Sequence, residues 1–257
     1  MEDQIKEIKI SALVIAKDEE KNIEDCLKSV SWCDEIILVD SKSTDRTVDI
    51  AKKYTDKIIV HDWQGYAFAR ELSLQNASGI WIICLDADER VSPELKNEVD
   101  QLLNQENLKN GYFIPRRNYF LDKVIKTCFW YPDYQMRLFK KESASVSQRE
   151  VHEGFIVKGE HGRLKNDLIH FTHQDLYSTF EKINKYSTLE ITEFINAKPV
   201  RKRDLIIHPV AAFLNHFISR KGYKDGMHGM MVSIVHAMTN MMRYMKLWEK
   251  QNVTKKE

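Results

Sequence analysis

The stretch from Trp81 to Glu89 constrains the fold of this chain more than any other. Its first five residues, Trp-Ile-Ile-Cys-Leu, are apolar without interruption, which is typical of a strand buried on both faces of a parallel sheet. Carboxylates follow at once, at Asp86, Asp88 and Glu89. The stretch therefore predicts an open α/β sheet with acidic side chains at the carboxyl end of a strand, where such sheets bind ligands.

The Asp-x-Asp pair at the end of this strand has two explanations. One carboxylate can hold a hard divalent cation while the other hydrogen-bonds a nucleotide. Alternatively, the acidic loop only leads into the next helix, since Ser92-Pro93-Glu94 is a good helix start. Both explanations can be true at once. The acidic residues that follow the earlier strands favour a site for metal and nucleotide.

Strands and helices alternate along the first hundred residues. This alternation implies right-handed crossovers and a mainly parallel sheet. We expect strands at 10–16, 35–39, 57–61 and 81–85, and helices after residue 20, after residue 45, at about 66–77 and at 93–105.

Acidic residues follow three of these strands, at Asp18, Asp40, Asp86 and Asp88. The carboxyl ends of parallel strands share one edge of the sheet, so these side chains should converge around one crevice. The chain has neither Gly-x-Gly-x-x-Gly nor Gly-x-x-x-x-Gly-Lys. A nucleotide here would need acidic side chains for its base and ribose, and a metal for its diphosphate.

The second half of the chain does not continue the alternation of strands and helices. Short aromatic-rich strands are expected at 112–121, 124–127 and 135–140, with a hairpin turn at Asp122-Lys123. Helices should follow from Ser178, which begins the capping-box pattern Ser-Thr-Phe-Glu, and at about 209–219 and 227–249. Seven of the nine methionines lie between Met227 and Met245, which suits either an ordinary packed helix or an adaptable apolar surface.

Composition excludes some classes of protein and partner. The net charge of +1 gives no global reason to expect nucleic acid. The four cysteines lack metal-type spacing and indicate a reduced, cytoplasmic chain. No run of 18 apolar residues occurs, so we expect no membrane span.

Three motifs carry a family resemblance: Ala-Lys-Asp-Glu-Glu-x-Asn-Ile from Ala16, Val-Asp-Ser-x-Ser-x-Asp-x-Thr from Val39, and Leu-Asp-Ala-Asp-Glu from Leu85. Together they resemble the family 2 glycosyltransferases of the GT-A fold. The aromatic block at 115–139 and Val151-His152-Glu153 resemble the lipopolysaccharide core glucosyltransferases of the WaaE and KdtX type. The resemblance implies a catalytic domain over 1–175, with a nucleotide-sugar half at about 8–105 and an acceptor half at 106–175, and a helical extension over 176–257.

The resemblance also implies roles in the donor half. Ala16 and Asp18 would surround the uracil and Asp40 would hydrogen-bond it, while Asp86 would hold the ribose. The implied nucleotide-sugar-binding set is Ala16, Asp18, Asp40, Arg70, Asp86 and Ala87. Arg70 falls where the family has a basic residue near the phosphates, whereas Glu71 stands where Asn is expected.

The metal implied by the family is Mg²⁺ or Mn²⁺, bound by Asp88 and bridging the diphosphate. His170 is the favoured second ligand, although a hydrogen-bonded structural histidine explains it equally well. His170 and His173 lie three apart in an extended segment, so they point to opposite faces and are poor joint ligands.

The implied reaction is a single inverting displacement at the anomeric carbon, for which the acceptor hydroxyl needs a general base. Glu153 is the favoured base and Asp133 its rival. Either acid could instead pair structurally with Arg137 or Arg149. The candidate acceptor residues are Trp130, Arg137 and His152.

The leading hypothesis is therefore an enzyme that moves a hexose, with glucose favoured, from a UDP-sugar to an inner-core sugar of lipopolysaccharide or a related glycolipid. The expected location is cytoplasmic, with peripheral contact to the inner face of the membrane through the C-terminal helices and their nearby basic residues. A homodimer is a further expectation. The alternatives are the same donor chemistry on a peptide, capsule or other polysaccharide acceptor, a metal-dependent nucleotidyltransferase, and a non-catalytic protein that binds a partner or membrane.

Overall fold

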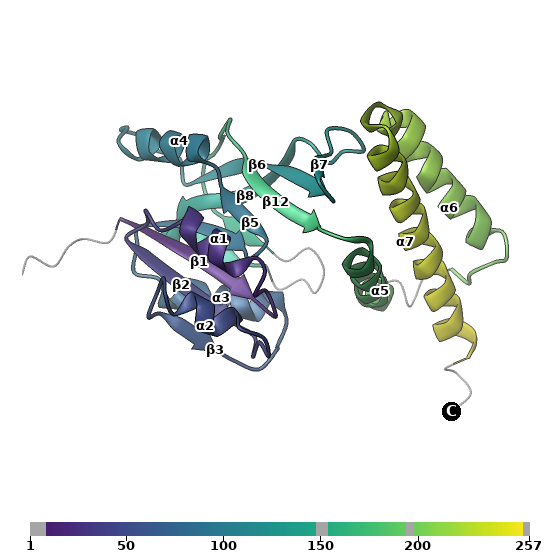
Figure 1. The fold of residues 1–257 in the computed structure, drawn as a ribbon, viewed down its shortest axis with the longest axis horizontal. Helices are drawn as coiled ribbons and strands as arrows, with labels where there is room; N and C mark the ends of the chain where they lie inside the picture. The colour runs from purple at the N-terminus through teal and green to yellow at the C-terminus, as the bar shows by residue number, and fades with distance from the viewer. Residues whose placement is uncertain (1–8, 148–153, 194–197, 254–257) are drawn as a thin grey trace, which may run out of the picture. The chain divides into compact units, whose positions relative to one another are not determined.

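The computed structural model describes residues 9–147, 154–193 and 198–253. These residues form two compact units (Figure 1). The first unit contains the chain up to Arg116 together with Tyr134–His170, and the second contains Arg117–Asp133 and the chain from Phe171 onward. The expected division at residue 175 stays a prediction, and the contacts assign 117–133 to the unit that holds the C-terminal helices.

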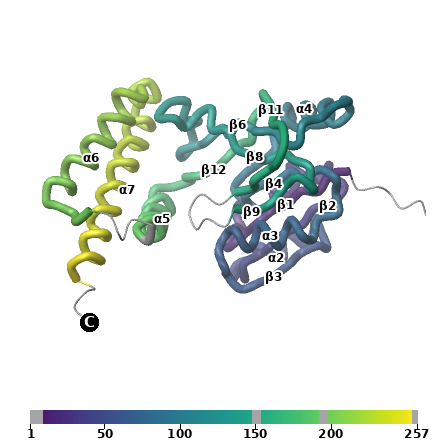
Figure 2. The backbone as a smooth tube through the Cα atoms, turned by 180° about the vertical axis from the view of Figure 1, so that it is seen from behind, coloured from purple at the N-terminus to yellow at the C-terminus, as the bar shows by residue number. Residues whose placement is uncertain are grey.

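The first unit is built on parallel strands in the spatial order β3-β2-β1-β4. Helices connect them in sequence, which confirms the expected α/β architecture (Figures 1 and 2). The strands are β1 (Ile10–Ala16), β2 (Glu35–Asp40), β3 (Ile58–Val60) and β4 (Trp81–Asp86), and the connecting helices are α1 (Ile23–Ser29), α2 (Thr47–Ala51) and α3 (Tyr66–Asn76).

The sheet continues beyond β4 in the order β8-β6-β12-β5, so it is mixed and mostly parallel only in its first half. The β4–β8 and β12–β5 pairs are antiparallel. The added strands are β5 (Glu89–Val91), β6 (Gly111–Phe120), β7 (Lys123–Val124), β8 (Asp133–Lys140), β11 (His161–Arg163) and β12 (Leu168–His173), and a separate pair is formed by β9 (Ala144–Val146) and β10 (Phe155–Val157).

The β6–β7 hairpin turns at Leu121-Asp122, one residue before the expected position. The strand expected over 124–127 is wrong in extent, because β7 ends at Val124. The N–H groups of Lys126 and Thr127 instead donate to the Asp225 carboxylate, each at 3.0 Å. The Asp225 carboxylate therefore accepts the backbone hydrogen bonds that a neighbouring strand would otherwise accept.

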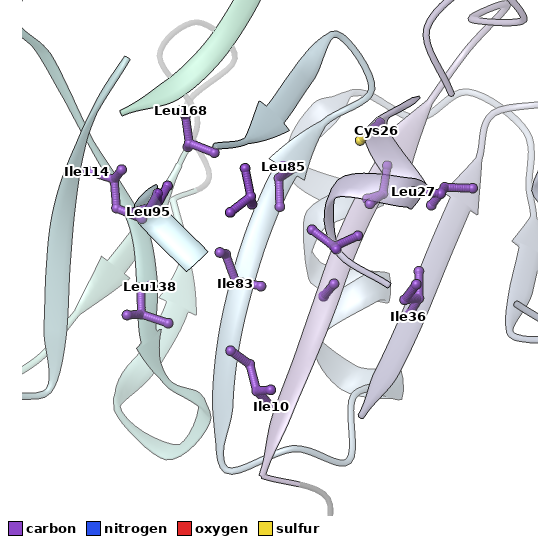
Figure 3. Close-up of a cluster of buried hydrophobic side chains, with 14 of the residues drawn as sticks. Ile10, Cys26, Leu27, Ile36, Ile83, Leu85, Leu95, Ile114, Leu138 and Leu168 are labelled. Atoms are coloured by element: carbon purple, nitrogen blue, oxygen red, sulfur yellow. The ribbon is translucent and has the colours of Figure 1, made fainter. Parts of the chain in front are cut away.

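Two apolar layers explain why β1 and β4 are almost entirely apolar. Alternate β1 residues point to opposite faces of the sheet. Val14 packs with Leu27 of α1 on one face, and Leu13 packs with Leu74 of α3 on the other. The first layer, which also contains residues of α4 (Pro93–Leu103), is drawn in Figure 3. Burial on both faces fixes the strand order from which the sheet-edge loops emerge.

The second unit contains α5 (Leu176–Glu193), α6 (Asp204–Leu214), the π-helical turn η2 (Asn215–Ser219), the 3₁₀ turn η3 (Gly222–Asp225) and α7 (Met227–Asn252). α6 and α7 lie side by side (Figures 1 and 2). The expected start of α6 at Pro209 is wrong, because the helix begins five residues earlier and contains this proline. Only one intrahelical N–H is lost, and packing of the helix against α7 compensates. Among the described residues, no helix has the length and apolarity needed to cross a membrane.

α5 is capped by Asp175, not by the expected Ser178. The Ser178 N–H donates to Asp175 Oδ1 at 2.7 Å, as an N-cap carboxylate requires. Asp175→Ala should therefore lower the free energy of unfolding of the second unit by about 1 kcal/mol in urea titrations followed by helical circular dichroism. Ser178→Ala is the matched control, with an expected change below about 0.5 kcal/mol. The reverse order of effects would show that Ser178 is the cap.

Candidate functional site

The carboxyl ends of β1, β2 and β4 meet at one edge of the sheet, as the sequence predicts. In the strand registers, Ala16 lies beside Asp40, and Ile15 lies beside Asp86. The loops that leave this edge carry Asp18 and Asp88. The structure thus brings the four predicted aspartates to one edge of the first unit.

The loops after β1 and β2 are fastened to each other by aspartate side chains. Asp18 Oδ1 accepts the Thr44 N–H at 2.7 Å, and this bond contributes most to holding the pKa of Asp18 below its usual value. Asp40 is fully buried, and its Oδ1 and Oδ2 accept the N–H and O–H of Ser43 at 2.8 and 2.5 Å. Asp40 therefore anchors the loop, and its direct bond to a base stays a prediction.

Asp86 lies between two buried guanidinium groups. Its Oδ1 accepts from Arg70 Nη2 at 2.8 Å, and its Oδ2 accepts from Arg137 Nη2 at 2.6 Å. Burial alone would raise the pKa of Asp86, but the charges of Arg137 and Arg70 outweigh it and hold this pKa well below its ordinary value. The Asp86 side chain, still 28% exposed, is therefore an ionised acceptor at neutral pH.

Glu89 is a site residue to which the sequence analysis gave no role. Its side chain is fully buried, and Oε1 accepts from Arg137 at 2.7 Å and from Arg116 at 3.2 Å. Its Oε2 accepts the Asp86 N–H at 3.0 Å and so closes the two-residue turn at Ala87-Asp88. The sequence does show Glu89 as a third acid directly after the apolar strand. A buried carboxylate needs a cationic partner, so the acid could have been matched with an arginine.

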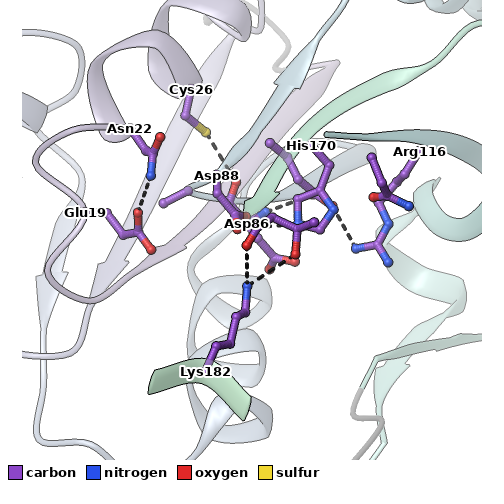
Figure 4. A network of polar contacts seen from close by, with 12 residues as sticks. Glu19, Asn22, Cys26, Asp86, Asp88, Arg116, His170 and Lys182 are labelled. Atoms are coloured by element: carbon purple, nitrogen blue, oxygen red, sulfur yellow. Dashed lines mark hydrogen bonds and ion pairs between the residues drawn. The ribbon is translucent and has the colours of Figure 1, made fainter. Parts of the chain in front are cut away.

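The two predicted metal ligands lie next to each other (Figure 4). β12 pairs with β5 so that His170 faces Glu89, one residue beyond Asp88. His170 Nε2 is 3.4 Å from Asp88 Oδ2, with side-chain exposures of 11% and 17%. His173, in contrast, belongs to the second unit, where Nδ1 lies 3.1 Å from Thr179 Oγ1.

A carboxylate beside an imidazole fits a divalent metal that takes its remaining ligands from a nucleotide. Mg²⁺ in particular is usually held by one or two carboxylates plus substrate phosphates and water. Within the described ranges, no three His, Cys, Asp or Glu side chains gather as a cluster able to hold an ion. Asp88 and His170 therefore suit an ion that arrives with a diphosphate.

The acceptor-side predictions have mixed outcomes. Glu153 and His152 lie outside the described residues, as does Arg149. Asp133 opens β8, and its Oδ2 accepts from Asn118 Nδ2 at 3.3 Å. Trp130 packs inside the second unit, where its Nε1–H donates to His236 at 3.1 Å. Arg137 belongs to the Asp86 and Glu89 network described above. The proposed roles of these residues stay predictions.

A family model and several known proteins are similar to this chain in sequence. The family model for glycosyl transferase family 2 matches residues 11–147. The lipopolysaccharide core biosynthesis glycosyltransferase LpsC of Rhizobium meliloti (strain 1021) is 27% identical over 254 residues, which are 96% of this chain and 94% of LpsC. The SPbeta prophage-derived glycosyltransferase SunS of Bacillus subtilis (strain 168) is 38% identical over 94 residues, which are 35% of this chain and 22% of SunS.

Among solved structures, S. aureus TarS 1–349 in complex with UDP superposes with a TM-score of 0.49 at 14% identity, over 94% of this chain and 90% of TarS 1–349. The mixed sheet, parallel over β3-β2-β1-β4, with flanking and C-terminal helices is the GT-A architecture that the sequence motifs implied. The family model covers more than half of the 257 residues and includes all three of those motifs. The chain is therefore a glycosyltransferase that belongs to glycosyl transferase family 2.

Proposed function

We propose that this enzyme transfers a hexose from a UDP-sugar to a glycolipid acceptor of the lipopolysaccharide core type, with a divalent metal and with inversion at the anomeric carbon. One observation carries the donor half of the proposal: Asp86 and Asp88 leave β4 beside the aspartate-linked loops of β1 and β2, with His170 next to Asp88. The similarity to LpsC along nearly the whole chain supports the acceptor class. Glucose is the favoured hexose.

The nucleoside would bind where the β1 and β2 loops are joined. Asp18 has a 42% exposed side chain and would accept from the base, while Asp40 keeps the loop at Ser43 in place. Asp86 would accept from the ribose hydroxyls, because a carboxylate held ionised by two arginines is a strong hydrogen-bond acceptor. Arg70 and Arg137 would orient that carboxylate through the hydrogen bonds that they donate to it, and Arg70 would lie near the diphosphate.

Asp88 and His170 would hold Mg²⁺ or Mn²⁺, which when bound neutralises charge on the departing nucleoside diphosphate. The acceptor oxygen attacks the anomeric carbon as its proton passes to a general base, for which Glu153 is favoured over Asp133. The bond to UDP breaks on the opposite side of the sugar ring, so the configuration inverts.

Calorimetric titration with UDP tests the donor site. Binding should strengthen at least tenfold when Mn²⁺ or Mg²⁺ is present, or about 1.4 kcal/mol. Asp88→Asn should abolish this gain, because the metal loses its carboxylate ligand. Asp49→Asn on α2, whose side chain is 75% exposed, is the matched control and should behave as wild type. If the folded protein binds no UDP under any metal condition, the proposal is wrong.

Product analysis tests the acceptor. UDP-hexoses should be consumed with lipopolysaccharide core oligosaccharide or its lipid-linked form, and not with peptides or capsule fragments. Transfer to peptides alone would overturn the glycolipid assignment while leaving the donor site intact. UDP binding without transfer to any of these acceptors would overturn the glycolipid assignment and leave the donor site intact.

A further inference from the structure

α6 and the turn after it present a row of apolar side chains to solvent. Ile206 is 67% exposed, Val210 is 51% exposed and Ile218 is 57% exposed. Residues four apart share a helix face, so 206, 210, 214 and 218 form one stripe. The members of this apolar stripe are Ile206, Ile207, Val210, Leu214 and Ile218. α6 packs against α7 along another side, so the described part of the second unit leaves the stripe uncovered.

Positive charge lies at both ends of the apolar stripe. Between residues 198 and 224 there are seven Lys and Arg side chains against a single acid, Asp204, although the whole chain has a net charge of only +1. Asp204 is used locally, since its Oδ2 accepts the Arg201 N–H at 2.8 Å. The basic residues are Lys198, Arg201, Lys202 and Arg203 before α6, and Arg220, Lys221 and Lys224 after it.

The basic end before α6 also borders a cavity of about 450 Å³. Arg201 and Arg203 line it together with His208 and Tyr244, whose rings stack with centroids 4.3 Å apart. Arg243, another lining residue, pairs with Glu190 at 2.5 Å. Lys198, Arg201 and Arg203 outnumber the one acid in the lining, Asp204, so this concave surface suits a phosphate-bearing group.

A second copy of the chain is a poor occupant for this surface. If two stripes met in antiparallel fashion, the basic cluster of one copy would face the basic cluster of the other, and a parallel arrangement has the same consequence. An anionic surface complements both ends at once. An 11-residue helix is about 16 Å long, which is enough to lie within a bilayer interface but not to span a bilayer.

We propose that α6 lies in the interface of an anionic lipid bilayer, with the apolar stripe among the acyl chains and both basic clusters against headgroup phosphates. The sequence pattern drew attention to the methionines of α7, whereas the structure identifies the aliphatic face of α6 as the lipid-facing surface. The idea that this contact brings the enzyme to a glycolipid acceptor rests on the proposed function above. The binding of α6 to lipid does not depend on that function.

Vesicle co-sedimentation of the full-length chain tests the proposal. Wild type should bind vesicles of phosphatidylglycerol and phosphatidylcholine at least tenfold more tightly than vesicles of phosphatidylcholine alone. The variant Ile206→Ser/Val210→Ser should lose at least tenfold in affinity for the anionic vesicles, and Lys202→Gln/Lys221→Gln should lose most of the anionic preference. Ile80→Ser, at a 48% exposed apolar position of the first unit, is the matched control and should bind as wild type.

Three outcomes would overturn the proposal. They are no vesicle binding by wild type, equal binding by wild type and the stripe variant, and a wild-type dimer that the stripe variant dissociates without any vesicle binding. Circular dichroism and UDP titration on the same samples separate this test from the donor site. Vesicle binding by a protein that does not bind UDP would support the lipid surface and contradict the proposed function.

Discussion

Glu89→Gln is expected to lower the free energy of unfolding of the first unit by about 3 kcal/mol. Glu89 accepts from Arg137 and Arg116 and from the Asp86 N–H while fully buried. The amide keeps the shape of the side chain but removes its charge. Arg116 and Arg137 would then each lose a charged partner, at 3.2 and 2.7 Å, while Asp86 still accepts from Arg70 and Arg137. Removal of one partner from a buried ionic group leaves uncompensated charge, which is why the expected loss is large.

Urea unfolding of the first unit, followed by a probe in the sheet, measures this loss. Glu160→Gln, at an exposed position between β10 and β11, is the matched control and should change the free energy of unfolding by less than about 0.5 kcal/mol. A double-mutant cycle with Arg137→Gln should give a coupling energy between about 0.5 and 3 kcal/mol, because the two side chains are in contact. A loss below about 1 kcal/mol for Glu89→Gln would mean that the arginines do not depend on it.

The parallel half of the sheet was predictable because its signals are local. β1, β2 and β4 are largely apolar, and each has an acid at its carboxyl end or within two residues after it. Strand alternation with helices then fixes a shared edge, so the convergence of Asp40 and Asp86 followed from sequence alone. The sequence motifs implied Asp88 and His170 as metal ligands, and the structure places them 3.4 Å apart; their metal-binding role stays a prediction.

The remainder depends on contacts between distant parts of the chain. Arg137 reaches Glu89 because β8 is antiparallel to β4, and no local period in the sequence encodes that pairing. The segment 117–133 joins the second unit because Asp225 accepts from Lys126 and Thr127, about a hundred residues earlier. β5, β9, β10 and β11 have three residues each, which is too short to show a strand period.

Acidification from pH 7 to pH 4.5 is expected to destabilise the second unit by about 3 kcal/mol through His236. Its Nε2 accepts the Trp130 Nε1–H at 3.1 Å, and the Trp indole can only donate, so His236 must be neutral. Its ring stacks on His216 with centroids 3.8 Å apart and planes at 10°. Burial, followed by the charges of His216, Arg220 and His173, lowers the pKa of His236 to about 3.

His236 destabilises the fold on acidification because its pKa is lower in the folded chain than in the unfolded chain. An unfolded histidine titrates at about 6.5, so below that pH the unfolded chain binds a proton that the folded chain does not. The unfolded state therefore gains stability as the pH falls toward 3, and at pH 4.5 two pH units of linkage have accumulated, worth about 3 kcal/mol. His216 acts in the same direction, because burial also lowers its pKa. Its Nε2 accepts from Arg220 at 2.9 Å, which excludes a proton there.

His236→Gln separates this titration from general acid unfolding. The amide oxygen can still accept from Trp130 but does not titrate, so the variant should lose most of the pH dependence between 7 and 4.5. Urea midpoints at both pH values, followed by circular dichroism and by Trp fluorescence, give the measurement. His228→Gln, which replaces a histidine paired with exposed Asp122, should keep the wild-type decline. An unchanged decline in His236→Gln would show that other groups cause the acid sensitivity, because the stacked pair would then contribute nothing to it.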